Sequence, residues 1–353
     1  MDPALNNPAA LDKFYIDEQL KMFDFSGIDK ASGLNFGEWV TKAITGELDL
    51  SPLGLVKRVG DMLVGELWQN WGLMRNLILI SVLSAILKLL SDSFKNKQAG
   101  EMGFYVSFMA VVMVLLASFQ TTLSIITTLV ATASNVMTAA LPIMFGVLLI
   151  SGKLAGAAAF SPIFAVTIEG LSLCVRFLLL PVIQFGAMME IVSCISAKSK
   201  LTNFTKLIRK VVGYALKGIA LLFLTVLSLQ KISSPIINST ALKVAKSGAA
   251  AIPVVGGMVS GAMDAVLFWG QAASSGLMVA LVITLTVVCS ASLIKILALL
   301  LMYKVTAALV QPVADDRIVK CIDAVGSFCV LLFEAGVVVV VMFIVSVAIM
   351  LAF

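Results

Sequence analysis

The sequence predicts an all-α membrane protein that crosses the bilayer about seven or eight times. Residues 103–152 form a run of fifty residues without one charged side chain. A soluble domain cannot bury so much apolar chain, whereas about 20 such residues cross the hydrocarbon core of a bilayer as a helix. Of all residues, 60% are hydrophobic and 13% are charged, against about 45–50% and about 25% in soluble domains. Similar apolar runs recur up to the C-terminal Phe353.

Residues 1–75 differ from the rest of the chain. They contain 11 Asp or Glu and 7 Lys or Arg. We interpret them as an extracytoplasmic polar and amphipathic segment that precedes a multi-pass transmembrane domain over residues 76–353. Residues 1–11 lack the apolar core of a secretory signal peptide. Either an internal span directs insertion or a leader is missing from this sequence.

Within this segment, a helix is expected to begin with Ser51 as N-cap and Pro52 in the first helical position. Apolar residues then recur at helical spacing, at Val56, Val59, Leu63 and Leu67. Trp68 and Trp71 follow, and tryptophan is typical of anchors at the membrane surface. The pattern indicates a helix that lies on the membrane surface. An amphipathic helix of a small soluble cap is the alternative.

Eight apolar segments are predicted to span the membrane. They lie at residues 77–90, 104–126, 132–151, 154–175, 177–195, 211–230, within 265–294, and at 335–353. The polar residues between Thr121 and Asn135 are expected to form the turn between the second and third spans. The fourth and fifth spans meet so tightly that a broken helix or a re-entrant pair is an alternative. Residues 248–263 are too short and too rich in glycine to cross the membrane.

Two loops carry the lysine and arginine residues that are typical of the cytoplasmic side. These basic residues are Lys88, Lys95 and Lys97 in the first loop, and Lys198, Lys200, Lys206, Arg209 and Lys210 in the second. Four predicted spans separate the loops and return the chain to the same side. Residues 1–75, and the C-terminus if there are eight spans, then lie outside the cytoplasm.

Two segments, residues 135–232 and 247–350, resemble each other weakly. LPIMFG at 141–146 is matched by IPVVGG at 252–257, and IRKVVGYAL at 208–216 is matched by IDAVGSFCV at 322–330. Duplicated halves with Pro- and Gly-interrupted helices are typical of transporters. A chance match between apolar sequences is the alternative.

The composition gives little support to enzyme activity. The chain has no histidine, the commonest general base and zinc ligand. Its five cysteines form no CxxC pair and are expected to be inert packing residues. Gly146, Gly152 and Lys153 suggest a phosphate-binding loop, but their spacing is wrong and Leu154 stands where Ser or Thr should bind magnesium. We therefore predict no catalytic residue, metal, cofactor or nucleic-acid partner.

Charged residues inside apolar runs are the sharpest candidates for function. They are Glu169, Arg176, Glu190, Lys217, Asp264, Lys295, Lys304 and Glu334. Each costs roughly 2.5–3.5 kcal/mol at the middle of a bilayer, so it should face protein, water or an opposite charge. The candidates for a transport path are Glu169, Arg176, Glu190 and Asp264. The alternative, favoured for Lys217, Lys295 and Lys304, is that the side chains lie near helix ends and extend to the lipid headgroups.

Small residues spaced by four are candidates for close helix packing. They are Gly152 and Gly156, and Gly257, Gly261 and Ala265. Their functional interpretation is packing between subunits of an oligomer, and ordinary packing within one copy is the alternative. Between these groups, Lys206, Arg209, Lys210 and Lys217 form a basic stripe suited to anionic lipid.

Several blocks of sequence resemble the stage III sporulation protein AE family of endospore-forming bacteria. They are FSPIF at 160–164, IPVVGGMVSGAMDAVL at 252–267 and QPVADDRIVKCIDAVGSF at 311–328, and the resemblance covers roughly residues 50–353. It implies a multi-pass protein of the mother-cell membrane around the forespore. It also implies partners: a secretion-type ATPase and other membrane proteins of an envelope-spanning complex. It implies no catalytic residues.

Three functions follow as hypotheses. The first is a permease-like or channel-core subunit of that complex, oligomeric and not an enzyme. The second is a membrane scaffold that nucleates ring assembly and conducts nothing. The third is an independent ion-coupled transporter. Charged residues that line a continuous wet cavity would favour the first, whereas charges confined to helix ends would favour the second.

Overall fold

The computed structural model describes residues 28–29, 52–93, 97–150, 154–195, 203–226 and 256–351, and the regular elements within them are helices. The elements are α4 (Pro52–Gln69), α5 (Trp71–Ser93), α6 (Lys97–Ile150), α7 (Leu154–Leu173), the π-helix η2 (Cys174–Leu179), α8 (Leu180–Ile195), α10 (Gly256–Val310) and α11 (Asp316–Leu351). A further helix covers residues 203–226. The all-α prediction is confirmed.

Five helical runs among the described residues are long and apolar enough to cross a membrane. They are Trp71–Leu89, Met102–Gly146, Phe164–Cys194, Leu277–Val310 and Asp316–Ala348. The prediction of a multi-pass helical membrane protein is confirmed. Five is fewer than the eight predicted spans for two reasons. The second and third predicted spans merge in α6, and the fourth and fifth merge in the run from α7 to α8. The sixth predicted span is not among the five, because the helix over residues 203–226 carries four basic residues and is amphipathic.

The predicted turn between Thr121 and Asn135 is wrong, because α6 continues through this stretch. The Oγ1 atoms of Thr121, Thr122 and Thr127 donate hydrogen bonds to carbonyl oxygens four residues earlier, at 3.2, 3.1 and 2.8 Å. Hydroxyls that bond back to their own helix satisfy their donors without ending it. A polar stretch in an apolar helix is therefore not sufficient to make a turn.

The tight junction predicted near residue 176 is the π-helix η2, which joins α7 to α8 without a break. A π-helical turn is rare and often occurs at functional sites. Arg176, one of the candidate path residues, lies in η2. Part of the glycine-rich stretch before residue 263 is likewise helical, since α10 begins at Gly256.

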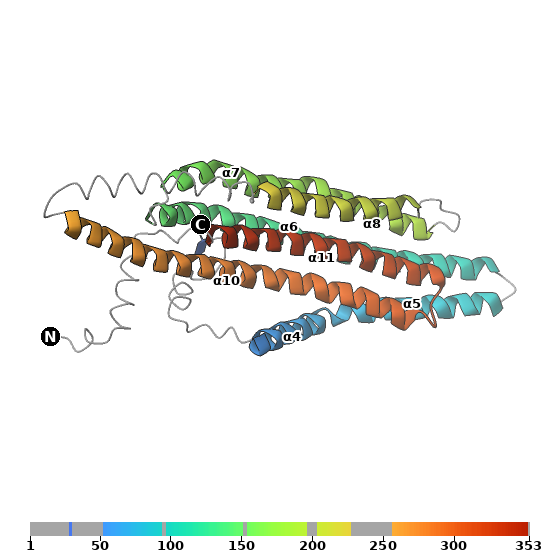
Figure 1. The fold of residues 1–353 in the computed structure, drawn as a ribbon. Coiled ribbons are helices and arrows are strands. Elements are labelled where there is room, and N and C mark those ends of the chain that lie inside the picture. Colours follow the sequence, from blue (N-terminus) through green and yellow to red (C-terminus); the bar gives the residue numbers. More distant parts are fainter. Residues whose placement is uncertain are drawn as a thin grey trace.

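The helices lie side by side in an elongated bundle (Figure 1). α5 packs along α6, α10 packs along α11, and α11 also contacts α6 and α8. α11 therefore occupies the middle of the bundle. α4 packs against α10, and Glu66 of α4 lies 3.8 Å from the Lys295 ammonium of α10.

The centre of the bundle is apolar along its described length. Its largest fully buried side chains include Phe108, Phe119, Phe328 and Phe343. The polar side chains buried with them are Ser and Thr residues and Tyr303, and none of the charged side chains that the structure describes is buried. The Tyr303 hydroxyl shares a hydrogen bond with Ser118. The described interior of one copy therefore buries no charged side chain.

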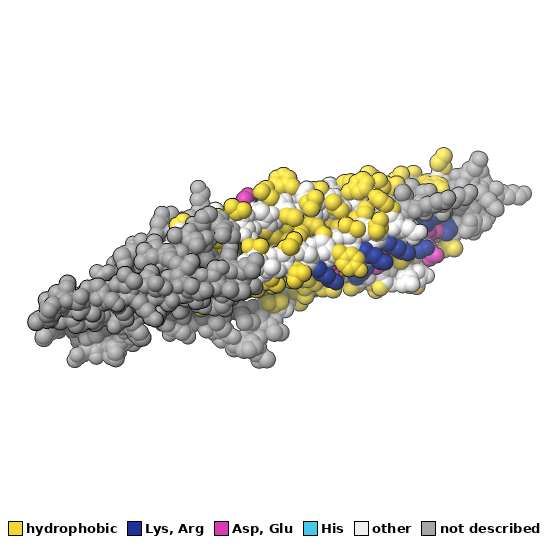
Figure 2. All heavy atoms as spheres, turned by 45° about the horizontal axis from the view of Figure 1, so that its top comes forward, with side chains coloured by type: hydrophobic (Ala, Val, Ile, Leu, Met, Phe, Trp, Pro, Cys, Tyr) yellow, Lys and Arg dark blue, Asp and Glu magenta, His cyan; other side chains and the backbone are white. Residues whose placement is uncertain are grey.

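One end of the bundle collects the ends of several helices and most of the charge. Lys88, near the end of α5, pairs with Asp315 in the turn between α10 and α11. Arg209 pairs with Glu190 near the end of α8. Figure 2 shows a row of Lys and Arg side chains toward this end, which we call the basic end. Only α6 and the run from α7 to α8 separate the two basic loops, so two passes replace the four predicted and the loops still share one side.

Candidate functional site: a charged cavity at the basic end

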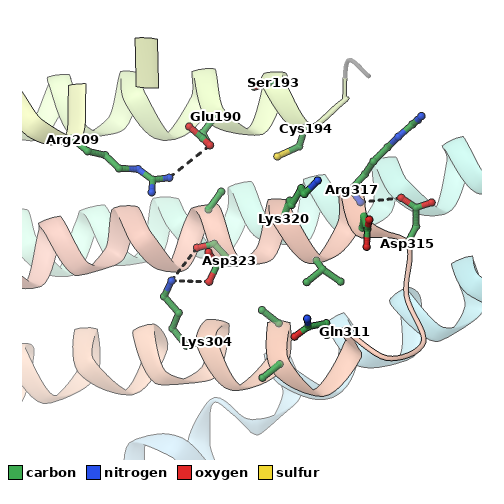
Figure 3. A pocket seen from close by; sticks show the side chains of 15 residues that line it. Glu190, Ser193, Cys194, Arg209, Lys304, Gln311, Asp315, Arg317, Lys320 and Asp323 are labelled. Carbon is green, nitrogen blue, oxygen red and sulfur yellow. Dashed lines mark hydrogen bonds and ion pairs between the residues drawn. The ribbon is translucent and has the colours of Figure 1, made fainter. Parts of the chain in front are cut away.

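A cavity of about 920 Å³ opens between the end of α8, the helix over residues 203–226 and the α10–α11 hairpin (Figure 3). We call it the charged cavity. Four acidic and four basic side chains line it: Glu190, Asp315, Asp316 and Asp323, and Arg209, Lys304, Arg317 and Lys320. Ser193, Cys194 and Gln311 add uncharged polar groups to the wall. Such a wall suits water and polar solutes, in contrast to the described interior of the bundle, which buries no charged side chain.

The α8 side of the cavity is built around Glu190 and Arg209. Glu190 Oε1 lies 3.8 Å from Arg209 Nη2, and the guanidinium carbon of Arg209 lies 4.6 Å from the centroid of the Phe328 ring. A cation over an aromatic face is attracted by the ring quadrupole. Glu190 Oε2 and Arg209 Nε are buried without a hydrogen-bond partner among the described residues. Because almost none of their surface is open to solvent, these two atoms stay unsatisfied in this arrangement.

Close helix contact at Gly186 makes this arrangement possible. Gly186 lies one helical turn before Glu190 in α8. A Cβ atom at Gly186 would lie 2.7 Å from Phe328 Cε1 and 2.9 Å from Ile208 Cγ2. The missing side chain thus lets α8 approach both α11 and the helix that carries Arg209.

The opposite side of the cavity is formed by the α10–α11 hairpin. Lys304 Nζ donates hydrogen bonds to Asp323 Oδ1 at 2.7 Å and to Ser327 Oγ at 2.8 Å. Gly326 allows this approach, because a Cβ atom there would lie 3.1 Å from Tyr303 Cβ. Lys304 is therefore paired with an acidic side chain within the protein, and its extension to lipid headgroups stays a prediction.

Asp315 closes the cavity at the hairpin turn and begins α11. Its Oδ1 accepts a hydrogen bond from the Arg317 backbone N–H at 2.9 Å, which is the role of an N-cap residue. Burial opposes ionisation of Asp315, but the hydrogen bonds from Lys88 and from the Arg317 backbone N–H outweigh it and hold the pKa of the carboxyl below its ordinary value. Asp315 is thus held as an anion near neutral pH, and its ion pair with Lys88 ties α5 to the α10–α11 turn.

Three charged side chains of the cavity lack an ion-pair partner among the described residues. They are Asp316, Arg317 and Lys320, all in the first turns of α11. The other five are held by Lys88 or by one another. Because Arg317 and Lys320 are positive and only Asp316 is negative, this part of the cavity favours the binding of anionic groups. The described residues contain no group of three His, Cys, Asp or Glu side chains that could hold a metal ion.

The four candidate path residues lie apart. Glu190 lines the charged cavity. Arg176 lines a separate groove of about 360 Å³ between α6 and the η2–α8 segment. Glu169 is exposed on α7 and lines neither of them. Asp264 lies in α10, but its side chain is outside the described part of the chain. A shared transport path for these residues stays a prediction.

The candidate packing residues are not tested either. Gly152 lies outside the described residues, and the side-chain surroundings of Gly156, Gly257, Gly261 and Ala265 are also outside them. Close contacts occur instead at Gly186 and at Gly336, where a Cβ atom would lie 2.8 Å from Ile126 Cδ1. The sequence contained a signal for both, because an isolated glycine in an apolar helix is costly unless close packing compensates it.

The pairing of Lys304 with Asp323 across the α10–α11 hairpin was not predicted from the sequence, although a signal existed. Lys304 lies nine residues before Val313 and Asp323 lies ten residues after it. A hairpin centred on Val313 brings such positions side by side. Recognising Gln311–Asp315 as a turn between two antiparallel helices would have predicted the pair.

Comparison with known proteins places these features in a family. The family model described as stage III sporulation protein AE matches residues 34–353. The chain belongs to this family. Stage III sporulation protein AE of Bacillus subtilis (strain 168) is 26% identical over 309 residues, which cover 87% of this chain and 77% of the relative. No solved structure matches the chain.

Membership in the stage III sporulation protein AE family supports a role in sporulation and confirms the resemblance identified from the sequence. The matched residues include the charged cavity and all five candidate spans. The family is one of sporulation membrane proteins and is not a known enzyme family.

Proposed function

We propose that this chain is a permease-like or channel-core subunit of the envelope-spanning complex between mother cell and forespore, located in the mother-cell membrane around the forespore. The charged cavity carries the proposal. A bundle whose described interior buries no charged side chain needs no cavity of about 920 Å³ with eight charged side chains if it serves only as an anchor. A polar solute that approaches an apolar bundle does need such a place, because charge is costly at membrane depth.

The position of the cavity also fits this role. The two basic loops assign the basic end to the cytoplasm. A solute or a partner on the mother-cell side would therefore meet the cavity first. Its partners on this account are the other stage III membrane proteins, a secretion-type ATPase, membrane lipid and further copies of the chain.

Substitutions in the cavity wall test the proposal in a sporulating strain. Glu190→Gln together with Arg209→Gln removes the pair without leaving a lone charge. We expect a complex that assembles normally in a pull-down but supports reduced forespore gene activity. Lys210→Gln is the matched control, because Lys210 is exposed on the same helix as Arg209 and does not line the cavity. Full activity of the double variant would refute the role of the cavity.

A scaffold function is favoured by a different observation. The apolar run Met102–Gly146 has 45 residues, or about 68 Å at 1.5 Å per residue, against a bilayer core of about 30 Å. The excess length can serve as a surface for partner proteins. A scaffold predicts that forespore activity falls only where assembly falls, so the same pull-down and activity measurements separate the two functions.

A further inference from the structure

Two cysteines meet at the wall of the charged cavity. The thiols of Cys194 and Cys321 share a hydrogen bond, and both are free thiols in the structure. Cys194 is the next-to-last residue of α8, and Cys321 lies near the start of α11. This is the only pair of thiols in contact among the described residues, which include all five cysteines.

The packing of α8 on α11 explains why these two thiols meet. α8 ends and α11 begins at the charged cavity, so the two helices run antiparallel. Gly186 of α8 touches Phe328 of α11, where an added Cβ atom would lie 2.7 Å from the ring. Eight residues further along α8 is Cys194, and seven residues back along α11 is Cys321. These steps are about 12 Å and about 10.5 Å at 1.5 Å per residue, so both thiols lie at the same level of the helix pair.

The two thiols differ in how they can be reached. Cys194 is half-buried and lines the charged cavity, and its side chain points from α8 toward α11 (Figure 3). Cys321 is fully buried and does not line the cavity. A small reagent in the cavity therefore meets Cys194 first and reaches Cys321 only through it. An accessible cysteine beside a second, resolving cysteine is the arrangement of redox-sensitive thiol pairs.

The side of the membrane decides what such a pair does. The two basic loops assign the basic end, and with it this cavity, to the cytoplasm. Thiols are kept reduced there, and the disulfides that do form in that compartment are usually transient. A bond between Cys194 and Cys321 would therefore respond to oxidation and would not be a permanent structural link.

We infer that Cys194 and Cys321 form a reversible disulfide that joins α8 to α11 at the charged cavity when a small disulfide oxidant enters it. The Cys194 sulfur attacks one sulfur of the oxidant and releases the other half as a small thiol. The Cys321 sulfur then attacks the Cys194 sulfur and releases the second small thiol. Two protein thiols are oxidised, the small disulfide is reduced to two thiols, and the two protons pass to those thiols.

The bridge would fix one wall of the charged cavity. Cys194 lies one helical turn after Glu190, which pairs with Arg209. A covalent link at this point holds the end of α8 against α11 and limits movement beside that ion pair. The bridge can form whether the chain serves as a channel core or as a scaffold.

Counting free thiols in the full-length protein tests the bridge. Cys174→Ser is the starting protein, because it removes the other half-buried thiol and leaves four of the five. Isolated membranes are treated with oxidised glutathione, and the excess is removed. The protein is then unfolded in detergent, so that the buried Cys289 and Cys329 also react. A maleimide coupled to polyethylene glycol counts the remaining thiols as steps on a gel.

We expect the oxidised starting protein to keep two of its four thiols, and dithiothreitol to restore all four. Peptide mapping should find Cys194 joined to Cys321 within one chain. Adding Cys321→Ser should trap glutathione on Cys194, because the resolving thiol is gone. Adding Cys194→Ser instead should leave all three remaining thiols free, because the oxidant has no path to Cys321.

Four results would overturn the inference. They are a starting protein that keeps all four thiols, a glutathione adduct that persists there in place of the bridge, a bridge that joins two chains or uses Cys289 or Cys329, and a loss of thiols in the Cys194→Ser variant. None of these results depends on forespore gene activity, so the proposed function stands or falls separately.

Discussion

The charged cavity and the Arg176 groove both hold charge among apolar helices, but they compensate it in different ways. In the cavity, Glu190 lies 3.8 Å from Arg209 and Lys304 lies 2.7 Å from Asp323, so most charges are balanced within one copy. In the groove, Arg176 is the one charged residue in a lining of amides, hydroxyls, Leu123, Leu180 and Pro181. The comparison shows that side chains of the same copy compensate most charges of the cavity, whereas the exposed Arg176 has no ion-pair partner among the described residues.

The largest effect is expected where the cavity wall depends on helix contact. Gly186→Leu places atoms where Phe328 and Ile208 already lie within 2.7 and 2.9 Å of the first added carbon. We expect a loss of roughly 3 kcal/mol in the free energy of unfolding, because overpacking forces helices apart. Thermal unfolding of the purified protein measures it. Gly170→Leu is the control, since nothing lies within 4 Å of a Cβ atom there, and equal losses in both variants would contradict the close contact.

The next effect compares the two regions directly. Glu190→Gln leaves the guanidinium of Arg209 half-buried without its anion, so the free energy of unfolding should fall by roughly 2 kcal/mol. Adding Arg209→Gln should restore part of that loss. Arg176→Gln should change the free energy of unfolding by less than about 0.5 kcal/mol, because no described residue compensates that charge. A large loss from Arg176→Gln would reveal a partner within the copy and would remove the contrast between the regions.

The smallest effect concerns the turn that closes the cavity. The pKa of Asp315 lies below its ordinary value of 3.8, so its ionised form contributes stability above that pH and loses it as the pH falls through the lower, folded-state pKa. A partly exposed pair of this kind contributes up to about 1 kcal/mol. As the pH falls below 3.8, the free energy of unfolding should drop more steeply for the unsubstituted protein than for Asp315→Asn. Parallel curves would mean that the Lys88–Asp315 pair contributes nothing.

The sequence was sufficient for the fold class and for the side shared by the basic loops. Long uncharged runs predict helices that can cross a bilayer. The two basic loops still lie on the same side, because the merging of spans reduced the passes between them from four to two, and both numbers are even. The sequence was not sufficient to predict that α6 continues from Lys97 to Ile150 without a turn. Ser, Thr and Asn are typical of turns, but Thr121 and Thr127 bond back to their own helix, and a linear sequence does not distinguish the two uses.

Only part of the candidate site could be predicted from the sequence. Glu190 was identified because a carboxylate in an apolar run is costly, and it lines the charged cavity. Its partner Arg209 was assigned to a lipid-facing stripe, because the contact that joins them depends on Gly186 and on the packing of three helices. Arg176 was identified for its charge, whereas Thr127 and Thr128 of α6, which line the same groove, were interpreted as part of a turn. Contacts between segments that are distant in the sequence depend on how the helices pack, and amino-acid composition alone does not predict that packing.

The central claim is that the charged cavity serves function and not only assembly. Forespore gene activity in strains that carry Glu190→Gln with Arg209→Gln, or Lys210→Gln, tests it most directly, with assembly of the complex measured by pull-down in the same cells. Arg209 and Lys210 lie on one helix, but only Arg209 lines the cavity. We predict normal assembly in both strains, with activity reduced only where the cavity pair is replaced. Equal activity of the two variants at normal assembly would contradict the account.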